Sequence, residues 1–362
     1  MERRKGIEMQ TLKSGSRKII TALVGTFALG AAVLYAPNLF AGKAVITEAS
    51  SNNVMKTPVQ AELDADQKII DLGGHTVPVL KNGLYDRFLS NPPLSVIAEK
   101  RPDLDLNWFK TLKKQKKEVG FTTYSPNFYY SNSSITAIYT ADMDRIEELM
   151  PEQVRSRVQP ISFVPGRGLI AITSYAYKYC DNDSYNELSI SIVTTRPNKS
   201  NFGLISLVGE IIHKDLWGYV LKLPVNTELA RVRGVVGYNL PKWLIPIEYN
   251  SDGNDVKFTY YDEQGKPDFS MVGKKLKIAA KEPEITRVNF TNLDAKGQLT
   301  HGYSDVRAIQ QASSRNGEDV QMNLSDGPLS TFIKSLGLKK LVRYDYQPEF
   351  QAALYTPELA KD

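Results

Sequence analysis

The spacing of apolar residues changes near Gly120 and divides the chain into two parts. Before it, NGLYDRFLS, PLSVIAEK and DLNWFKTLKKQKKE repeat apolar residues at helical spacing, which predicts a helical segment over about 62–118. After it, short runs rich in Tyr, Val, Ile, Phe and Thr alternate with turn residues, which is typical of strands. We therefore predict a helical N-terminal segment followed by a β-rich domain.

The β-rich part predicts individual elements. SSITAIYT, GLIAITSYAYKY, LSISIVTT and YVLKLPV have the composition of strands, and ADMDRIEELM that of a short helix capped by Asp142 and stopped by Pro151. Hairpin turns are expected at Asp252-Gly253 and Gln264-Gly265. GPLSTFIKSLGL predicts a helix, and VRYDYQPEFQAALY a last strand. No βαβ alternation with a glycine-rich phosphate loop is present, which disfavours a nucleotide-binding fold.

The first 44 residues have a leader pattern. Seven Lys/Arg and two Asp/Glu accompany the apolar run Ile19 to Tyr35, which is followed by small residues in APNLFAGKA. This order predicts a signal peptide, or an N-terminal membrane anchor because the run approaches the ~18 residues of a spanning helix. The small, polar residues 45–60 predict a linker. We expect an exported protein, periplasmic or tethered to the outer side of the inner membrane in a bacterium.

The net charge of +5 over 362 residues is accounted for by that leader. The rest of the chain holds 38 residues of each sign, which argues against a nucleic-acid surface. Within it, a basic run is interpreted as a solvated helix face, or alternatively as a surface for anionic lipid. Its lysines are Lys110, Lys113, Lys114, Lys116 and Lys117.

Cysteine and histidine contribute little candidate chemistry. Cys180 is the only cysteine, so an intrachain disulfide is excluded, and we interpret it as a structural residue at a strand end. The histidines His75, His213 and His301 lack the spacing of zinc ligands. We expect no metal and no cofactor, with an all-oxygen metal site as the alternative left open.

Lys242 stands in an unusually apolar setting, between Leu240-Pro241 and Trp243-Leu244-Ile245-Pro246. Burial disfavours the charged form of a lysine and so frees the amine to attack a carbonyl carbon. One interpretation is therefore a Schiff-base lysine. The other is a strand-edge lysine whose stem covers apolar surface while its amine reaches water.

Four stretches resemble the acetoacetate decarboxylase family. YVLKLPVNTELARVRGVVGYNLPKWLIPI is similar to the family motif in which a Schiff-base lysine follows a proline, Gly-aromatic-x-Pro-Lys. SITAIYTADMDRIEELMPE, YKYCDNDSYNELSISIV and DVQMNLSDGPLSTFIKSLGLKKLVRYDY are similar to other parts of the family, in the same order. The resemblance covers about residues 120–360, within a domain expected over 119–362. It implies an α+β fold with a closed or nearly closed antiparallel β-barrel, to which residues 45–118 are an addition.

The resemblance also implies roles for named residues. Lys242 would condense with the ketone of a β-keto acid and, as a protonated imine, accept the electron pair released when carbon dioxide leaves. Glu187 matches the glutamate beside that lysine and would orient the substrate or transfer protons; otherwise it is a surface acid. Tyr185, Tyr238 and Trp243 are candidates for the pocket wall.

The sequence departs from the family pattern at two places. The family's lysine is commonly followed by a second lysine, where this chain has Trp243. An arginine is expected near the first strand to engage the substrate carboxylate, and the nearest match here is Asn132. Arg167 in PGRGL could substitute for it, although such a sequence is often a turn. A further glutamate of the family has no clear match in LIAITSYAY.

Two classes of function follow from these observations. The first is a Schiff-base lyase acting on a small oxo-acid, by decarboxylation or by aldol or dehydration chemistry on the same lysine. The second is an exported, non-catalytic module that binds a keto-bearing ligand. In either case we expect a small-molecule ligand, a homo-oligomer, no nucleic acid, and a membrane tether through residues 19–35 if the leader is retained.

Overall fold

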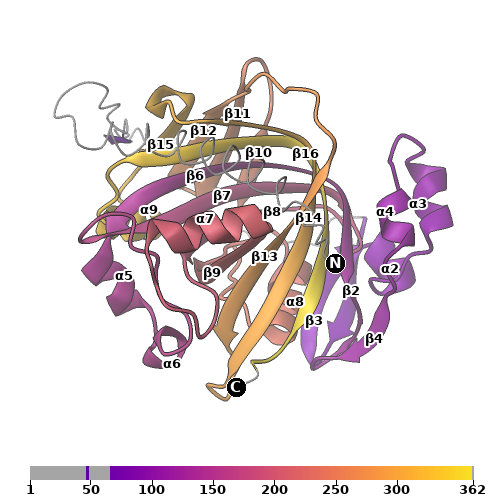
Figure 1. Cartoon of the computed structure of the whole chain (residues 1–362). Coiled ribbons are helices and arrows are strands. Elements are labelled where there is room, and N and C mark those ends of the chain that lie inside the picture. The colour runs from indigo at the N-terminus through magenta and orange to yellow at the C-terminus, as the bar shows by residue number, and fades with distance from the viewer. Residues whose placement is uncertain (1–45, 49–65, 361–362) are drawn as a thin grey trace, which may run out of the picture. The chain divides into compact units, whose positions relative to one another are not determined.

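The computed structural model describes residues 46–48 and 66–360. In this part of the chain seven strands close into a barrel, in the order β13-β14-β16-β6-β7-β8-β9 (Figure 1). The barrel strands are β6 (Asn127–Asp142), β7 (Arg167–Cys180), β8 (Tyr185–Val193), β9 (Asp215–Lys222), β13 (Glu284–Leu293), β14 (Leu299–Ser314) and β16 (Leu341–Leu359). The β-rich class and the closed barrel predicted from the sequence are confirmed.

The barrel departs from the all-antiparallel prediction at the seam where it closes. β9 and β13 are parallel, with Arg287 opposite Asp215 and Thr291 opposite Tyr219, whereas the other neighbouring pairs are antiparallel. Parallel strands need a long crossover connection. The chain between β9 and β13 supplies it, because it leaves the barrel to form a helix and three strands of a second sheet.

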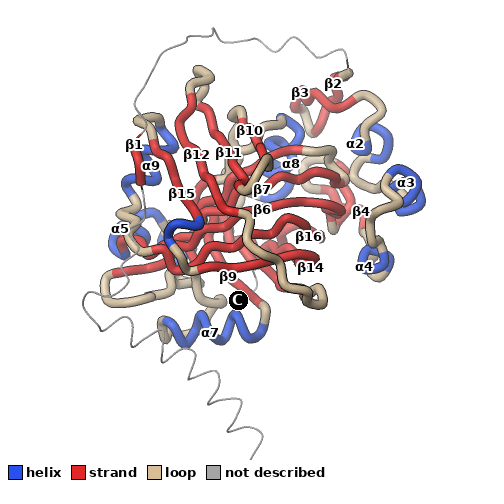
Figure 2. The backbone as a smooth tube through the Cα atoms, turned by 90° about the horizontal axis from the view of Figure 1, so that it is seen from above, coloured by secondary structure: helices blue, strands red, loops and turns tan. Residues whose placement is uncertain are grey.

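The second sheet lies against the outer face of the barrel (Figure 2). Its strand order is β1-β15-β12-β11-β10. Buried residues alternate along the strands, as in Val256, Phe258 and Tyr260, because one face of each strand is turned to the core. They pack against barrel residues such as Ile135 and Ile172, forming the largest apolar core. The strands are β1 (Ile46–Glu48), β10 (Ile247–Asn250), β11 (Asp255–Tyr261), β12 (Pro267–Lys274) and β15 (Val320–Leu324).

Helices and short turns connect these strands. Asp142 caps the helix that follows β6, accepting a hydrogen bond from the backbone N–H of Arg145 at 3.2 Å, and Pro151 follows that helix as predicted. Gly253 and Gly265 adopt positive φ at the two predicted hairpin turns. The elements are α5 (Met143–Leu149), α6 (Glu152–Arg155), α7 (Leu204–His213), α8 (Glu228–Tyr238), the 3₁₀ turn η1 (Gly317–Asp319) and α9 (Pro328–Ser335).

Residues 66–125, called the N-terminal segment from here on, are only partly helical. The predicted helices at NGLYDRFLS and PLSVIAEK are present, and Figure 1 shows them beside the barrel. In DLNWFKTLKKQKKE only α4 is helical, and strand β4 replaces the rest of the predicted helix; β2 and β3 pair before the first helix. The elements are β2 (Gln67–Leu72), β3 (His75–Leu80), α2 (Leu84–Phe88), α3 (Leu94–Lys100), α4 (Asn107–Lys110), β4 (Gln115–Glu118) and β5 (Thr122–Ser125).

The basic run does not form one solvated helix face. Lys114 is buried and lies 2.5 Å from Asp181, whose side chain is fully buried. Lys114 also donates to the backbone oxygen of Ser90. Burial lowers the pKa of Lys114, and burial raises the pKa of Asp181. Lys116 is exposed beside Glu118, but on strand β4, so only Lys110, exposed at the end of α4, fits a solvated helix face.

Two further sequence predictions concern the start of the chain and its cysteine. The leader, including the apolar run 19–35, and the linker 49–60 lie outside the described residues. In residues 66–360, none of the helices is long and apolar enough to cross a membrane. Cys180 is buried at the end of β7, and its thiol donates to the backbone oxygen of Asp183 at 2.8 Å. Burial raises the pKa of this thiol, as suits a structural residue.

Candidate active site

Lys242 follows α8 in a segment that is neither helix nor strand. Asn239 ends α8 in the left-handed conformation, and Leu240 N–H donates to the backbone oxygen of Gly234 at 3.0 Å. Pro241 and Pro246 lack backbone N–H groups, so neither can donate a backbone hydrogen bond in this segment. The short segment between them is therefore free to pair with another part of the chain.

That pairing is made by Val225 and places Lys242 beside β8. Val225 N–H donates to the backbone oxygen of Trp243 at 3.0 Å, and Ile245 N–H donates to that of Val225 at 3.0 Å. On its other side Val225 forms a bridge with Glu187 of β8. Val225 thus lies between the two segments, which brings Lys242 next to Glu187 although the sequence separates them widely.

Gly234 of α8 makes room for the aliphatic stem of Lys242. A Cβ at position 234 would overlap Cδ of Lys242 and would lie 2.5 Å from its Cε. The stem therefore lies flat on the helix backbone, and only glycine fits there without movement of the lysine. The helix directs the Lys242 amine toward Glu187.

Lys242 and Glu187 form a buried ion pair. Nζ of Lys242 donates to Oε2 of Glu187 at 2.5 Å, and their side chains are 6% and 7% exposed. Two charges out of water hold together only when hydrogen bonds satisfy them, and the loss of one partner leaves a buried charge. At this distance a proton can pass directly between the amine and the carboxylate.

Tyrosines enclose the pair. The hydroxyl of Tyr177 donates to Oε1 of Glu187 at 3.0 Å, so both carboxylate oxygens are engaged. Nζ of Lys242 lies 5.4 Å from the ring centroid of Tyr185, whose hydroxyl lies 3.0 Å from that of Tyr129. Burial raises the pKa of Tyr177 and of Tyr185 well above the ordinary value. These phenols stay neutral near pH 7 and act as hydrogen-bond donors.

The register of β7 and β8 explains why these tyrosines lie around the Lys242–Glu187 pair. Tyr175 lies opposite Glu187, and Tyr177 lies opposite Tyr185, so all four side chains point to one face of the sheet. The rings of Tyr175 and Tyr177 stack at 5.3 Å, and those of Tyr177 and Tyr185 approach to 4.6 Å. Burial raises the pKa of Tyr175 to about 12. The lysine amine therefore lies against an aromatic surface.

Of the predicted wall residues, only Tyr185 lies at the pair. The hydroxyl of Tyr238 is hydrogen-bonded to the side-chain amide of Asn127, and its ring packs with Leu223 and Leu240. Trp243 packs against the core between the barrel and the second sheet, with Nζ of Lys222 5.7 Å from its ring centroid. The structure does not bring Trp243 to Glu187, because neighbouring residues of an extended segment point to opposite sides. Tyr238, the last residue of α8, is directed to Asn127 instead.

The two candidates for carboxylate binding lie in different places. Arg167 starts β7 and donates to the backbone oxygens of Thr140 and Gly337, at 3.0 and 2.5 Å. It stands eight residues along the strand from Tyr175, roughly 26 Å, so it cannot contact the pair. Asn132 is fully buried on β6, opposite Tyr177. Its Nδ2 donates to the backbone oxygen of Phe350 at 2.9 Å, and its Oδ1 has no partner.

Sequence reasoning missed Tyr177 and Gly234. The alternation in SYAYKY puts Tyr175 and Tyr177 on one face of a strand, and this signal could have been combined with the position of Glu187. A β-bulge then turns Tyr179 to the other face. Gly234 carries no local signal, because its role depends on a lysine that the chain brings back onto the helix.

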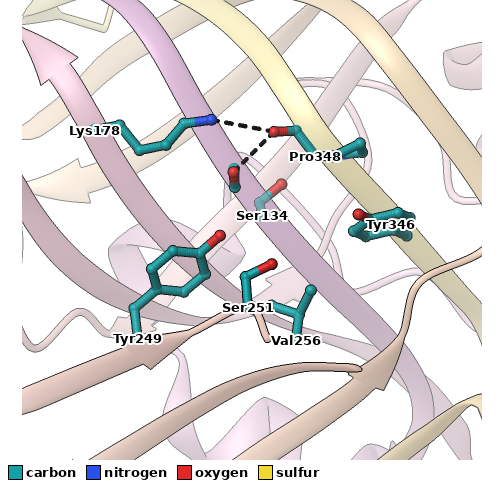
Figure 3. A pocket seen from close by; sticks show the side chains of 8 residues that line it. Ser134, Lys178, Tyr249, Ser251, Val256, Tyr346 and Pro348 are labelled. Carbon is teal, nitrogen blue, oxygen red and sulfur yellow. Dashed lines mark hydrogen bonds between the residues drawn. The ribbon is translucent and has the colours of Figure 1, made fainter. Parts of the chain in front are cut away.

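The pair is nearly closed to solvent, since its side chains are only 6% and 7% exposed. A hollow of about 180 Å³ lies on the barrel wall between Lys178, Tyr249 and Pro348 (Figure 3), and another of about 570 Å³ lies beside His301 and Tyr355. Neither is lined by Lys242 or Glu187. Across residues 66–360 there is no cluster of three or more His, Cys, Asp or Glu side chains that could hold a metal ion.

The chain is similar to several solved structures. An acetoacetate decarboxylase structure shares 14% identity over 66% of this chain and 90% of that chain, with a TM-score of 0.49. The acetoacetate decarboxylase of Legionella pneumophila shares 11% identity, over 66% and 88%, with a TM-score of 0.48. The enduracididine biosynthesis enzyme MppR, complexed with pyruvate, shares 13% identity, over 66% and 91%, with a TM-score of 0.47.

Two of these three structures are named acetoacetate decarboxylase, the family whose sequence pattern residues 120–360 resemble. No protein-family model and no curated protein sequence matches the chain. Because the identities are 14% or lower and the TM-scores are below 0.5, these likenesses do not define the reaction of this chain. The fold and the lysine site define a closed β-barrel protein with a buried lysine–glutamate pair walled by tyrosines.

Proposed function

We propose that the protein forms a Schiff base between Lys242 and the carbonyl carbon of a small keto acid, and that it decarboxylates a β-keto acid. The observation that carries this proposal is the buried pair of Lys242 and Glu187, with 2.5 Å between Nζ and Oε2. An amine attacks a carbonyl only in its neutral form. Glu187 is placed to accept the proton that the ammonium must lose.

The proposed reaction needs no cofactor. The Nζ lone pair adds to the ketone carbon, water leaves, and a protonated imine forms. The electrons of the bond to the carboxylate then move into the imine, which releases carbon dioxide and leaves an enamine. Protonation of the enamine at carbon and hydrolysis return the ketone product and the free amine. Glu187 and the neutral hydroxyl of Tyr177 are the groups placed to move these protons.

Asn132 supports a second candidate reaction on the same lysine. A cation is the usual partner of a substrate carboxylate, whereas Asn132 offers an amide whose Oδ1 is buried without a partner. An acceptor of this kind suits a hydroxyl or amine of the substrate better than a carboxylate. Aldol or dehydration chemistry through the same imine is therefore the alternative, and a non-catalytic binding module is the third.

Release of carbon dioxide from acetoacetate and from longer β-keto acids tests the leading proposal. We expect turnover by the unaltered protein and none by Lys242→Arg, because a guanidinium keeps the charge but forms no imine. Lys178→Arg is the matched control, because Lys178 also pairs with a glutamate, Glu349 at 2.7 Å, in a more exposed setting. Imine formation without gas release would move the assignment to aldol or dehydration chemistry. If neither an imine nor carbon dioxide is formed, a non-catalytic binding module remains as the interpretation.

A further inference from the structure

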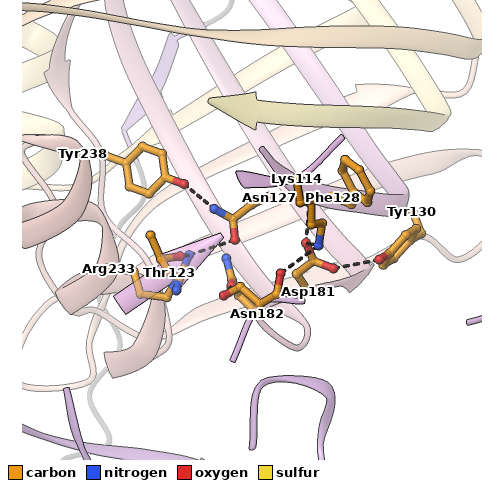
Figure 4. A network of polar contacts seen from close by, with 10 residues as sticks. Lys114, Thr123, Asn127, Phe128, Tyr130, Asp181, Asn182, Arg233 and Tyr238 are labelled. Atoms are coloured by element: carbon orange, nitrogen blue, oxygen red, sulfur yellow. Dashed lines mark hydrogen bonds and ion pairs between the residues drawn. The ribbon is translucent and has the colours of Figure 1, made fainter. Parts of the chain in front are cut away.

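Arg233 of α8 is a buried cation whose hydrogen bonds go to neutral oxygens. Its side chain is 2% exposed, and Nε is buried without a partner. NH2 donates to Oγ1 of Thr123 at 3.0 Å and to Oδ1 of Asn127 at 2.8 Å, and NH1 lies 3.5 Å from the hydroxyl of Tyr85 (Figure 4 shows part of this network). Within residues 66–360 no carboxylate forms an ion pair with it. Such a cation costs free energy to bury, so its retention needs an explanation.

The partners of Arg233 come mostly from the N-terminal segment. Tyr85 lies on α2 and Thr123 on β5, and the rings of Tyr85 and Phe121 lie 5.2 and 5.5 Å from the guanidinium carbon. The apolar residues Leu229 and Val232 of α8 pack into the same region, against Leu72, Val77 and Phe121 of the N-terminal segment. One side of α8 is thus fixed to this segment by both apolar and polar contacts.

The other side of α8 holds Lys242. Gly234 is the residue next to Arg233, and the stem of Lys242 lies on its backbone. Neighbouring residues of a helix point about 100° apart, so Arg233 faces the N-terminal segment while Gly234 faces the lysine. A shift of α8 would therefore move the surface on which Lys242 rests.

We propose that Arg233 is a positioning residue for Lys242, which fastens α8 to the N-terminal segment and so holds Gly234 against the lysine stem. Residues 66–118 of the N-terminal segment, which the resemblance marks as an addition to the barrel, are on this account part of the support of the lysine site. The part of the proposal that is tested by imine formation rests on the Schiff-base function proposed above. The part that concerns the position of α8 does not depend on that function.

The test compares Arg233→Met with Arg231→Met in the full chain. Arg231 lies on the same helix but pairs with Glu228 near the surface, so its loss leaves the contacts with the N-terminal segment intact. We expect Arg233→Met to slow the single-turnover rate of borohydride-trapped imine formation at saturating acetoacetate by about 10–100-fold, since small displacements of a reacting group are costly. The half-saturating concentration should change less than about twofold, and Arg231→Met should match the unaltered protein.

A second variant covers the case in which Arg233→Met is poorly folded. Tyr85→Phe removes one hydroxyl of the N-terminal segment, which touches neither Lys242 nor Glu187, and we expect a smaller slowing in the same direction. Combined with Arg233→Lys, its effect should be less than additive, because both changes weaken one contact. Circular dichroism of each variant checks that the comparison is made on folded protein.

Amide hydrogen exchange of residues 230–238 tests whether Arg233 fastens α8, independently of whether Lys242 forms an imine. We expect faster exchange there in Arg233→Met and Tyr85→Phe than in Arg231→Met. If the unaltered protein forms no imine, the proposed function fails, and exchange alone then decides the role of Arg233. Unchanged exchange in α8, or imine formation by folded Arg233→Met at the rate of the unaltered protein, overturns the positioning role.

Discussion

Gly234 and Lys242 are in direct contact: the aliphatic stem of the lysine lies on the helix backbone at the glycine, where a Cβ would overlap Cδ. The contact joins α8 to the segment that follows it and directs the amine to Glu187. This contact explains how Lys242 is held in an apolar setting with its amine directed to Glu187 rather than to water.

Gly234→Ala should displace Lys242. We expect a loss of stability of about 1–3 kcal/mol from the added methyl group, and a slower reaction of the lysine with keto acids. Gly209→Ala in α7 is the control, because a Cβ at 209 has no atom within 4 Å and alanine favours a helix. Urea denaturation of the two variants measures the difference. Equal stability of both variants would contradict the contact.

Glu187→Gln should leave the ammonium of Lys242 buried without an anion. We expect a loss of about 3–5 kcal/mol in the free energy of unfolding, as for other buried pairs with one partner removed. Glu349→Gln breaks the more exposed pair with Lys178 and should cost less than about 1 kcal/mol. A Glu187→Gln protein as stable as Glu349→Gln would show that the buried pair does not form in solution.

Tyr177→Phe removes the hydrogen bond to Oε1 of Glu187. We expect a loss of stability of about 1 kcal/mol and a slower proton transfer at the lysine. Tyr179→Phe is the control on the same strand, because the hydroxyl of Tyr179 is buried without a partner and its removal should be neutral or stabilising. If imine formation slowed equally in both variants, Tyr177 would have no specific part in the site.

Glu210 should make stability depend on pH. It is 3% exposed on α7, its Oε2 accepts the backbone N–H of Trp217 at 3.3 Å, and burial raises its pKa from 4.5 to about 8. Because the folded state holds the proton of Glu210 more tightly than the unfolded state, Glu210 contributes to the free energy of unfolding. This contribution is full below pH 4.5 and is lost as the pH rises through 8. Relative to Glu210→Gln, the native protein should lose stability across this range, by at most ~1.4 kcal/mol per pH unit. Urea denaturation at pH 5, 7 and 9 measures it, and a constant difference between the two proteins would contradict the assigned pKa.

The sequence predicts the barrel better than it predicts the site. Strand β11 is indicated by alternating apolar and polar residues and β6 by its composition, and Asp142 and Pro151 bound a helix by local chemistry. The pairing of Lys242 with Glu187 followed from resemblance, because no local signal connects residues that meet only through Val225. The neighbouring strands β4 and β5 override the helical pattern around Lys114, since pairing there satisfies backbone groups that a short exposed helix would leave to water.

The most direct measurement of the central claim is the mass of the peptide that contains Lys242 after incubation with acetoacetate and reduction with borohydride. Reduction converts a protonated imine into a stable secondary amine, so the account predicts an added mass on Lys242 in the unaltered protein. The same adduct should be absent from Lys242→Arg and undiminished in Lys178→Arg. A panel of β-keto acids, pyruvate and simple aldehydes that labels other lysines, or none, while leaving Lys242 unmodified would contradict the account.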